Sequence, residues 1–115
     1  MSTEGTCIFC RILRGEIPAQ ILERTEHAVA FADVNPQAPD HALVVPVRHV
    51  ENLGAFVDAA SAAEVHDLFA LAAKIGARSP QGYRVVTNTG PHATQSVFHL
   101  HLHVLGGRQM TWPPG

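Results

Sequence analysis

The most regular pattern of hydrophobic and polar positions lies near the C-terminal end, over residues 98–105. Histidine alternates there with leucine or valine, and a period of two is typical of a β-strand. One side of such a strand faces the core, and the opposite side presents three imidazoles. The core-facing residues are Leu100, Leu102 and Val104, and the imidazoles belong to His99, His101 and His103.

Four other segments also predict strands. Residues 17–24 alternate in part and residues 28–32 form a short β-like run, so the two are expected to make a hairpin around residues 25–27. Residues 42–46 form a continuous apolar run, which is typical of a strand buried on both faces. Residues 83–87 supply the last segment. Together with the histidine strand, these segments predict a five-stranded antiparallel sheet.

Helix-period patterns occur in two places. Ser61-Ala62-Ala63-Glu64 is a capping box, and the apolar residues after it keep helical spacing until Gly76. A shorter helix is predicted over residues 7–14, with Thr6 as its cap and Gly15 just beyond its end. One main helix, a short N-terminal helix and five strands indicate an α+β fold.

The composition narrows the class of protein. The 115 residues fit one domain, residues 1–115, and 46% of them are hydrophobic, as in globular proteins. The net charge is −2 and the eight lysines and arginines are scattered, so no footprint for duplex nucleic acid is expected. No apolar run approaches the length of a membrane span and no signal peptide is recognisable, so we expect a cytoplasmic protein without membrane contact. Eight histidines equal the lysines and arginines in number, which points to imidazole chemistry.

The two cysteines form a Cys-x-x-Cys pair, Cys7 and Cys10. In a cytoplasmic protein, this spacing indicates metal binding or redox chemistry rather than a structural disulfide. Two histidines within reach would complete a closed zinc site with two cysteine and two histidine ligands. A redox-active dithiol and a pair of metal-free thiols are the two alternatives.

The three histidines allow three interpretations. They can form an exposed polar face, although three histidines are an unusual choice for such strand positions. His99 and His101 can share a catalytic metal with an open position for water, as an H-x-H pair. One imidazole can instead act as a nucleophile, while its neighbours fix its tautomer or protonate a leaving group.

The segment His99-Leu100-His101-Leu102-His103-Val104-Leu105 resembles the histidine-triad signature of the HIT superfamily. Gln95-Ser96-Val97-Phe98 before it, and the GGRQM and WPPG segments after it, resemble the HINT branch, the histidine-triad nucleotide-binding proteins. Upstream, the segments CIFC, FADVNPQAP, DHALVVPVRH and YRVVTN fall where that branch has its equivalents. The resemblance implies a HIT-like fold over nearly the whole chain.

The same resemblance implies an enzyme. HINT-type proteins bind purine nucleoside monophosphates and hydrolyse phosphoramidate (P–N) bonds, so His101 is expected to attack the α-phosphorus and form a nucleotidyl-histidine intermediate. Neutral imidazole is a competent nucleophile near neutral pH. His99 would orient His101, partly through its main-chain carbonyl, which would accept the ring N–H of His101. His41 would lie behind the triad. His103 and Ser96 would contact the phosphate or the leaving group.

Nucleotide contacts are also implied by position. Asp33 would accept hydrogen bonds from the ribose hydroxyls, and Asn88 would contact the substrate or its phosphate, unless it only ends a strand. Charge on the phosphoryl oxygens would be stabilised by His103 and by the main-chain N–H groups around Gln95, Ser96 and Val97. The base would lie in an apolar slot, for which ordinary core packing is the alternative, formed by Ile8, Phe9, Phe31 and Val34.

Zinc and a second subunit are implied as well. In HIT proteins with this cysteine pair, the zinc ligands correspond to Cys7, Cys10, His49 and His99, a closed structural site. A homodimer is expected through residues 61–76 and 83–88, with the tail around Trp112 reaching the partner's site.

One loop departs from the family pattern. Residues 91–96 read Pro-His-Ala-Thr-Gln-Ser, where relatives approach the Gln-Ser pair through glycines. The Cβ of Thr94 restricts the backbone beside the phosphate, so we expect an altered substrate preference or rate. Two rival functions stay open: a zinc-water hydrolase in which His99 and His101 share the metal, and a nucleotide-binding scaffold whose hydrolysis is incidental.

Overall fold

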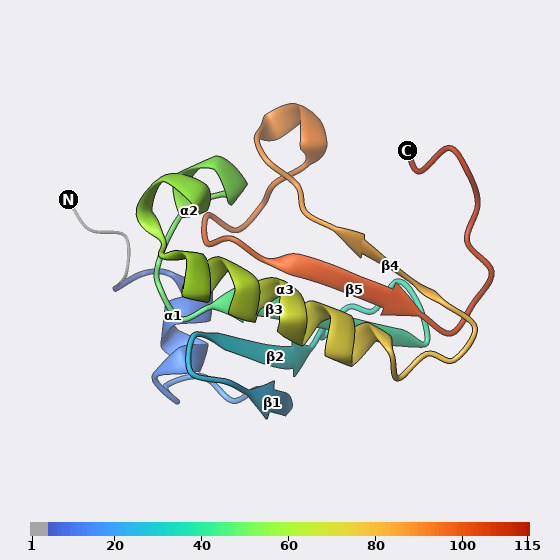
Figure 1. Ribbon diagram of the computed structural model, residues 1–115, viewed down its shortest axis with the longest axis horizontal. Helices are drawn as coiled ribbons and strands as arrows, with labels where there is room; N and C mark the ends of the chain where they lie inside the picture. The colour runs from blue at the N-terminus through green and yellow to red at the C-terminus, as the bar shows by residue number, and fades with distance from the viewer. Residues whose placement is uncertain (1–4) are drawn as a thin grey trace.

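The computed structural model describes residues 5–115. Five strands form one sheet in the order β1-β2-β3-β5-β4 (Figure 1). They are β1 (Ile21–Arg24), β2 (Ala28–Ala32), β3 (Asp40–Pro46), β4 (Tyr83–Val86) and β5 (Leu102–Gly106). Every neighbouring pair is antiparallel, so the predicted five-stranded antiparallel sheet is confirmed. The pairing of β3 with β5 brings the histidine segment to the middle of the molecule.

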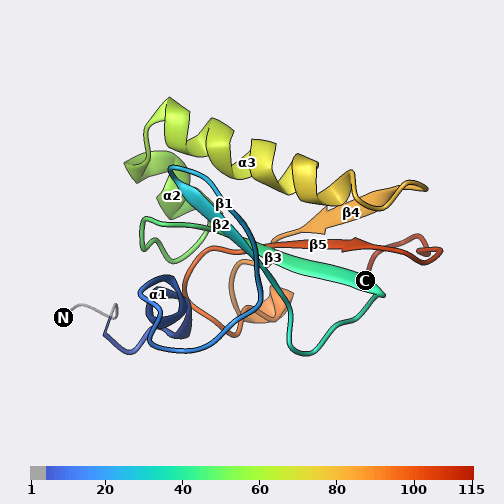
Figure 2. The same ribbon diagram turned by 90° about the horizontal axis from the view of Figure 1, so that it is seen from below.

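Helices cover both faces of this sheet. The longest helix, α3 (Ala62–Gly76), lies along one face, and α1 (Ile8–Leu13) lies against the opposite face (Figure 2). α2 (Leu53–Ala59) precedes α3, and a short 3-10 turn, η1 (Pro91–Ala93), lies in the loop between β4 and β5. The predicted capping box at Ser61 is present at the start of α3. In the described part of the chain, no helix is long and apolar enough to cross a membrane.

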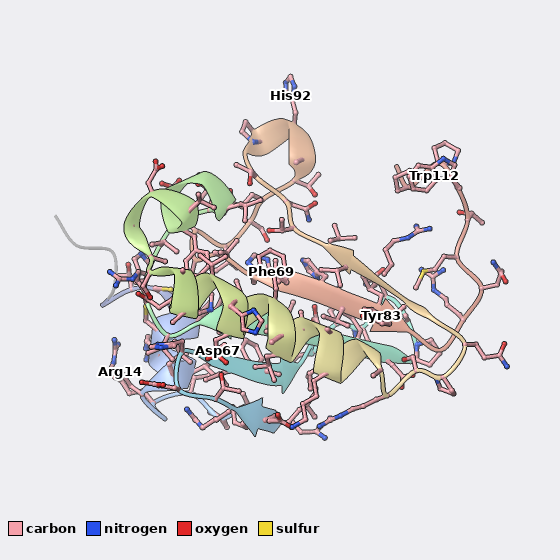
Figure 3. All side chains as sticks on the ribbon, in the orientation of Figure 1. Arg14, Asp67, Phe69, Tyr83, His92 and Trp112 are labelled. Carbon is pink, nitrogen blue, oxygen red and sulfur yellow. The ribbon has the colours of Figure 1, made fainter. Side chains whose placement is uncertain are left out.

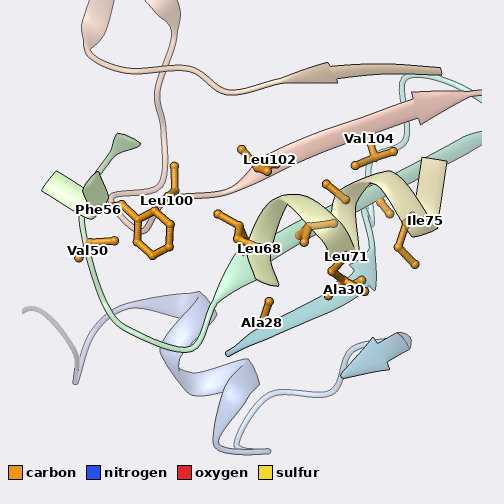
Figure 4. Packing of buried hydrophobic residues seen from close by; sticks show 13 residues of the cluster. Ala28, Ala30, Val50, Phe56, Leu68, Leu71, Ile75, Leu100, Leu102 and Val104 are labelled. Atoms are coloured by element: carbon orange, nitrogen blue, oxygen red, sulfur yellow. The ribbon is translucent and has the colours of Figure 1, made fainter. Parts of the chain in front are cut away.

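Two hydrophobic clusters pack on the two faces. The side chains of β2 and β3 alternate between them, so that Ala30 lies in the α3-side cluster and Phe31 in the α1-side cluster. This burial on both faces explains why the two strands are continuous apolar runs. The α3-side cluster (Figure 4) includes Phe56, Leu68, Leu71, Leu100, Leu102 and Val104. The α1-side cluster includes Phe9, Val29, Phe31, Leu43 and Val45.

The histidine segment enters the sheet later than its alternation predicts. β5 begins at Leu102 rather than at residue 98, so the first two histidines precede the strand. The reason lies in the partner strand, because β3 ends at Pro46, which has no N–H to continue the ladder. Leu100 donates its N–H to the carbonyl of Val50 instead, at 2.8 Å. The alternation of faces persists, since Leu100 and Leu102 both lie in the α3-side cluster.

Two element ends near the N-terminus also differ from the expectations. Cys7, and not Thr6, caps α1, because the Cys7 thiol accepts the N–H of Cys10 at 3.4 Å. β1 begins at Ile21 instead of residue 17, since its register with β2 starts there. The thiol cap places Cys7 at the point where α1 meets the sheet.

The helix α2 is missing from the predicted elements. It has seven residues, too few for a clear period, and Gly54 lowers its helix propensity. Asn52 caps it, with the side-chain oxygen accepting the Ala55 N–H at 3.0 Å. Phe56 fixes it to the α3-side cluster. Tertiary packing therefore stabilises this helix, and the local sequence pattern does not predict it.

Candidate active site and metal centre

The three histidines belong to two adjacent sites on the α1 side of the sheet. His99 is fully buried and turns toward the N-terminal cysteines, whereas the ring centroids of His101 and His103 lie 5.0 Å apart. Phe9 of α1 packs edge-on against both His99 and His101, with centroid distances of 6.0 and 5.1 Å. One short helix therefore borders both sites.

Four side chains from three parts of the chain converge around His99. The donor atoms of Cys7, Cys10, His49 and His99 lie within 4.8 Å of one another. His99 Nδ1 lies 3.5 Å from each thiol sulfur and 3.2 Å from His49 Nδ1. His49 Nδ1 lies 3.1 Å from the Cys10 sulfur. A tetrahedral zinc with sulfur bonds of about 2.3 Å and nitrogen bonds of about 2.0 Å needs donor separations of roughly 3.3–3.8 Å, so the cluster fits this ion in spacing and donor type.

His99 is held in the tautomer that suits a metal ligand. Its Nε2 lies 2.9 Å from the carbonyl oxygen of Pro46, which only accepts, so the ring proton is on Nε2 and Nδ1 keeps its lone pair. A main-chain carbonyl is a common outer partner of a metal-bound histidine. Burial lowers the pKa of His99 to about 4, so its ring is neutral at neutral pH.

The ring of His101 presents the other nitrogen. Its Nδ1 donates to the main-chain carbonyl of His99 at 2.8 Å, which leaves the lone pair on Nε2. Thr87 holds the backbone at the same residue by donating its hydroxyl to the His101 carbonyl at 3.1 Å. The buried ring of His101 therefore has one unprotonated nitrogen in a fixed orientation, which is what a nucleophile needs.

Asp33, His41 and His103 form a hydrogen-bonded row beside His101. The Gln37 N–H donates to His41 Nδ1 at 2.9 Å, so the ring proton of His41 is on Nε2. This Nε2 lies 2.9 Å from His103 Nδ1 and 3.3 Å from the carboxylate of Asp33. His103 Nδ1 accordingly accepts a hydrogen bond, and the proton of its own neutral ring is on Nε2.

Burial is the largest influence on the protonation of this row. It lowers the pKa of His103 to about 4, with further lowering by the rings of His101 and His41 and an opposing effect of Asp33. Burial also lowers the pKa of His41, and the negative charge of Asp33 opposes this effect by raising it. Both rings are therefore neutral at neutral pH, and an anion bound beside them would raise their pKa. The donor atoms of Asp33, His41 and His103 lie close enough together to hold an ion, but the hydrogen bonds already account for their spacing.

The loop between β4 and β5 carries the remaining residues expected near the phosphate. Asn88 lies near its start, and Ser96 lies exposed near its end. Thr94 adopts a φ of 64°, a left-handed conformation that β-branched residues rarely take. Gln95 turns its side chain back onto main-chain groups of the protein. Thr94 therefore has the backbone conformation that a glycine at this position would adopt without strain.

The four residues expected to line a base slot fall into two pairs. Phe9 and Phe31 are buried and pack edge-on, with centroids 5.5 Å apart. They belong to the α1-side cluster, in line with the core-packing alternative. Ile8 and Val34 are 45% and 97% exposed. A cavity of about 280 Å³ lies beside Ile8 and borders the metal cluster, because its lining includes Cys7 and His49 together with Thr6, Ser96, Val97 and Phe98.

Two contacts that fix the histidines have no counterpart among the expected site residues. They are the carbonyl of Pro46, which sets the tautomer of His99, and the N–H of Gln37, which sets that of His41. Both are main-chain groups, which nearly every residue type supplies. The identity of the residues at these positions therefore does not predict the two contacts.

Comparisons with known proteins agree with this geometry. The family model of the HIT domain matches residues 14–110. A 14 kDa zinc-binding protein of Zea mays is 42% identical over 128 aligned positions, covering 97% of this chain and 90% of that protein. An uncharacterised HIT-like protein of Synechococcus elongatus is 47% identical over 111 positions, covering 94% of this chain and 96% of that protein.

Solved structures share the arrangement of strands and helices. A HIT family hydrolase from Legionella pneumophila superposes with a TM-score of 0.87 at 41% identity, covering 95% of this chain and 99% of that chain. A zinc-bound histidine triad family protein from Mycobacterium smegmatis superposes with a TM-score of 0.79 at 29% identity, covering 91% of this chain and 77% of that chain.

Proposed function

Because this chain belongs to the HIT domain family and has the HIT-like α+β fold, we propose that it is a nucleotide-binding hydrolase that cleaves the P–N bond of purine nucleoside monophosphate conjugates. One observation carries the proposal: His101 has a lone pair on Nε2, and the adjacent His103 has an N–H on Nε2. A nucleophile thus lies next to a hydrogen-bond donor. Membership of the HINT branch, a single domain over residues 1–115 and a cytoplasmic location rest on the sequence and stay predictions.

The proposed reaction has two steps. His101 Nε2 attacks the α-phosphorus, the P–N bond breaks, and its electron pair leaves with the amine. The bound phosphate raises the pKa of His103, so that the protonated ring donates its Nε2 proton to the departing nitrogen. Water then attacks the nucleotidyl-histidine and returns a proton to His103. This step releases the monophosphate and restores neutral His101.

The neighbouring groups support both steps. The His99 carbonyl accepts the Nδ1 proton of His101, so it stabilises the positive charge that this ring gains when Nε2 bonds to phosphorus. His41 orients His103 through its Nδ1, and the negative charge of Asp33 opposes the lowering of the His103 pKa, so it favours the protonated form. The carbonyl and the carboxylate therefore act on two different rings.

We assign the remaining nucleotide contacts from the positions of the side chains. Asp33 has one oxygen on the Asn35 N–H, at 2.8 Å, and the other facing His41, and its lone pairs are available to ribose hydroxyls. Asn88 and Ser96 flank the loop that would receive the phosphate. The base would lie over the exposed Ile8 and Val34, since Phe9 and Phe31 are buried in the α1-side cluster.

We also infer a structural zinc in the cluster around His99, held by Cys7, Cys10, His49 and His99. When bound, the ion supplies a closed four-ligand crosslink with no open position for water. The zinc-binding relative from maize and the zinc-bound structure from M. smegmatis support this assignment. His101 belongs to neither group of potential metal ligands found in residues 5–115, which argues against a zinc-water hydrolase.

The proposed homodimer is supported by exposed apolar side chains on α3 and β4. Phe69 and Tyr83 are 44% and 43% exposed (Figure 3). β4 is an edge strand of the sheet, so its outer edge offers main-chain groups to a second copy. Trp112 is 81% exposed on the C-terminal tail (Figure 3). Arg84 of β4 holds this tail, because its guanidinium lies 5.9 Å from the centre of the Trp112 ring and donates to the Thr111 carbonyl at 2.9 Å. The reach of Trp112 into a partner's site stays a prediction.

A single-turnover experiment tests the proposed function. The protein is mixed in excess with an adenosine 5′-phosphoramidate of an alkylamine, quenched at intervals and analysed by peptide mass spectrometry. We expect an adenylyl adduct on His101 that forms and then decays, and no adduct in His101→Ala. Turnover without an adduct, or an adduct at another residue, would overturn the mechanism. AMP binding without any turnover would identify a nucleotide-binding scaffold.

A further inference from the structure

The side chain of Gln95 is fully engaged with the main chain of the protein. Its Oε1 accepts the N–H of Gly90 at 3.1 Å, and its Nε2 donates to the carbonyls of Glu51 at 2.7 Å and Val97 at 3.1 Å. The main-chain N–H of Gln95 donates to the Gly90 carbonyl at 3.1 Å. An amide group has two N–H donors, and both are used here. Gln95 therefore has no donor left for a phosphate, which changes its expected role as a direct nucleotide contact.

These bonds close part of the loop into a small ring. The two bonds between Gly90 and Gln95 enclose the 3-10 turn η1. Thr94, inside this ring, has the left-handed φ of 64°. Such a conformation persists at a β-branched residue when the surrounding contacts fix the backbone on both sides. The bonds of Gln95 provide that constraint.

A second pair of bonds attaches the loop to the segment that follows β3. Gln95 reaches the carbonyl of Glu51, and Leu100 donates its N–H to the carbonyl of Val50 at 2.8 Å. The stretch between Gln95 and Leu100 is therefore held at both ends. The segment that holds it follows directly on His49, a member of the metal cluster.

Between these fixed ends lie the main-chain N–H groups of Ser96 and Val97. Within residues 5–115, neither N–H donates a hydrogen bond to a protein group. Ser96 is exposed, and both residues line the cavity beside Ile8. Consecutive N–H groups bind anions well when the backbone that presents them is held in place.

We propose that Gln95 is a positioning residue for phosphate binding, which holds the N–H groups of Ser96 and Val97 in place for the nucleotide phosphate without touching it. This inference rests on the proposed function and names the residue that positions the phosphate subsite expected at these two N–H groups. Because Gln95 also bonds to Glu51, the geometry of the subsite depends on the segment that carries His49. A nucleoside without a phosphate gains nothing from Gln95.

Calorimetric titrations with AMP and with adenosine separate positioning from general stability. Gln95→Met keeps the side-chain length and removes the amide. We expect its affinity for AMP to fall about tenfold or more, the scale of a weakened hydrogen bond to a charged group, and its affinity for adenosine to change less than about twofold. Gln81→Leu, in the exposed turn before β4, is the matched control and keeps both affinities.

Amide hydrogen exchange on the unmodified chain gives a second measurement that does not depend on a variant. AMP is expected to slow exchange at Ser96 and Val97, and adenosine is not. Equal losses of AMP and adenosine affinity in Gln95→Met, an unchanged AMP affinity, or a lack of protection at these two amides would overturn the positioning role alone. If the unmodified chain binds neither compound, the proposed function fails and the inference fails with it.

Discussion

The ring of His101 donates a hydrogen bond to the main-chain carbonyl of His99 at 2.8 Å. The His99 ring itself is held by the Pro46 carbonyl on one nitrogen and faces the metal cluster with the other. A single residue therefore connects the metal centre to the proposed nucleophile. Many catalytic histidines are oriented by a carboxylate. Here a backbone group two residues away fixes the tautomer instead, so the orientation of His101 depends on local backbone geometry.

Replacing His101 should separate catalysis from metal binding. We expect His101→Asn to lower kcat/KM for an adenosine phosphoramidate on the order of 10³-fold or more, as for other lost nucleophiles, and to keep its zinc. Steady-state kinetics and elemental analysis measure the two quantities. His92→Asn is the matched control, because this side chain points away from the sheet at the tip of the loop (Figure 3). Loss of zinc together with activity would favour the hydrolase with a shared metal.

Removing one thiol should release the metal and weaken the fold. Cys10→Ser loses a zinc ligand that also packs in the α1-side cluster. We expect the bound zinc to fall well below that of the unmodified chain and the free energy of unfolding to drop by about 2–5 kcal/mol. Metal analysis and thermal unfolding with and without a chelator test this. In His66→Asn, a variant of an exposed histidine on α3, both values should match the unmodified chain.

Acid should weaken the fold through His103. The pKa of His103 is about 4 in the folded chain and 6.5 as the ordinary value, so between these values the unfolded chain binds more protons and stability falls as the pH falls. His41 shifts in the same direction. The free energy of unfolding should therefore depend less steeply on pH in His103→Asn than in the unmodified chain over this range. The metal cluster is common to both proteins, so equal slopes would contradict the expectation.

A charge on the exposed face of α3 should abolish the proposed dimer. Phe69→Lys replaces an apolar contact of the expected interface with a cation, which is costly to bury. Sedimentation velocity should then show a monomer, whereas the unmodified chain is expected to sediment as a dimer. Val57→Lys, which changes an exposed apolar residue on α2, should leave the dimer intact. A monomeric unmodified chain would refute the dimer itself.

The left-handed residue in the loop should reverse the usual preference for alanine over glycine. At Thr94 the φ of 64° penalises any side chain with a Cβ. Thr94→Gly should therefore be more stable than Thr94→Ala by about 1 kcal/mol, although alanine loses less entropy on folding. Chemical unfolding of the two variants measures this difference. The reverse order of stability would mean that the loop has another backbone conformation in solution.

Features that depend on repeating side chains were predictable from the sequence. The capping box at Ser61 marks the start of α3, because both of its residues must be present at a fixed spacing. The alternation of residues 99–104 assigned Leu100 and His101 to opposite faces, even though the strand begins only at Leu102. Faces alternate along any extended backbone, whether or not its ladder bonds form.

Among contacts made by main-chain groups, the resemblance predicted the one between the His101 ring and the His99 carbonyl, and the others were not predictable. Any residue in place of Gln37 except proline would offer the same N–H to His41. The hydrogen bond from Gln95 to the carbonyl of Glu51 joins positions far apart in sequence, so no repeating pattern of residues predicts it. The late start of β5 depends on where Pro46 lies in the partner strand, which only the pairing of β3 with β5 reveals. Sequence motifs thus indicated which side chains matter, and the fold was needed to show what orients them.

The division of the hydrophobic residues between two clusters allows the two faces of the sheet to change separately. Successive residues of β2, such as Ala30 and Phe31, support different faces of the sheet, and the clusters described above have no member in common. Substitutions on the exposed surface of α3, where a second copy is proposed to attach, can therefore leave the packing around His101 and His103 unchanged. The sheet thus separates the face that carries α3 from the face that holds the histidines in their orientations.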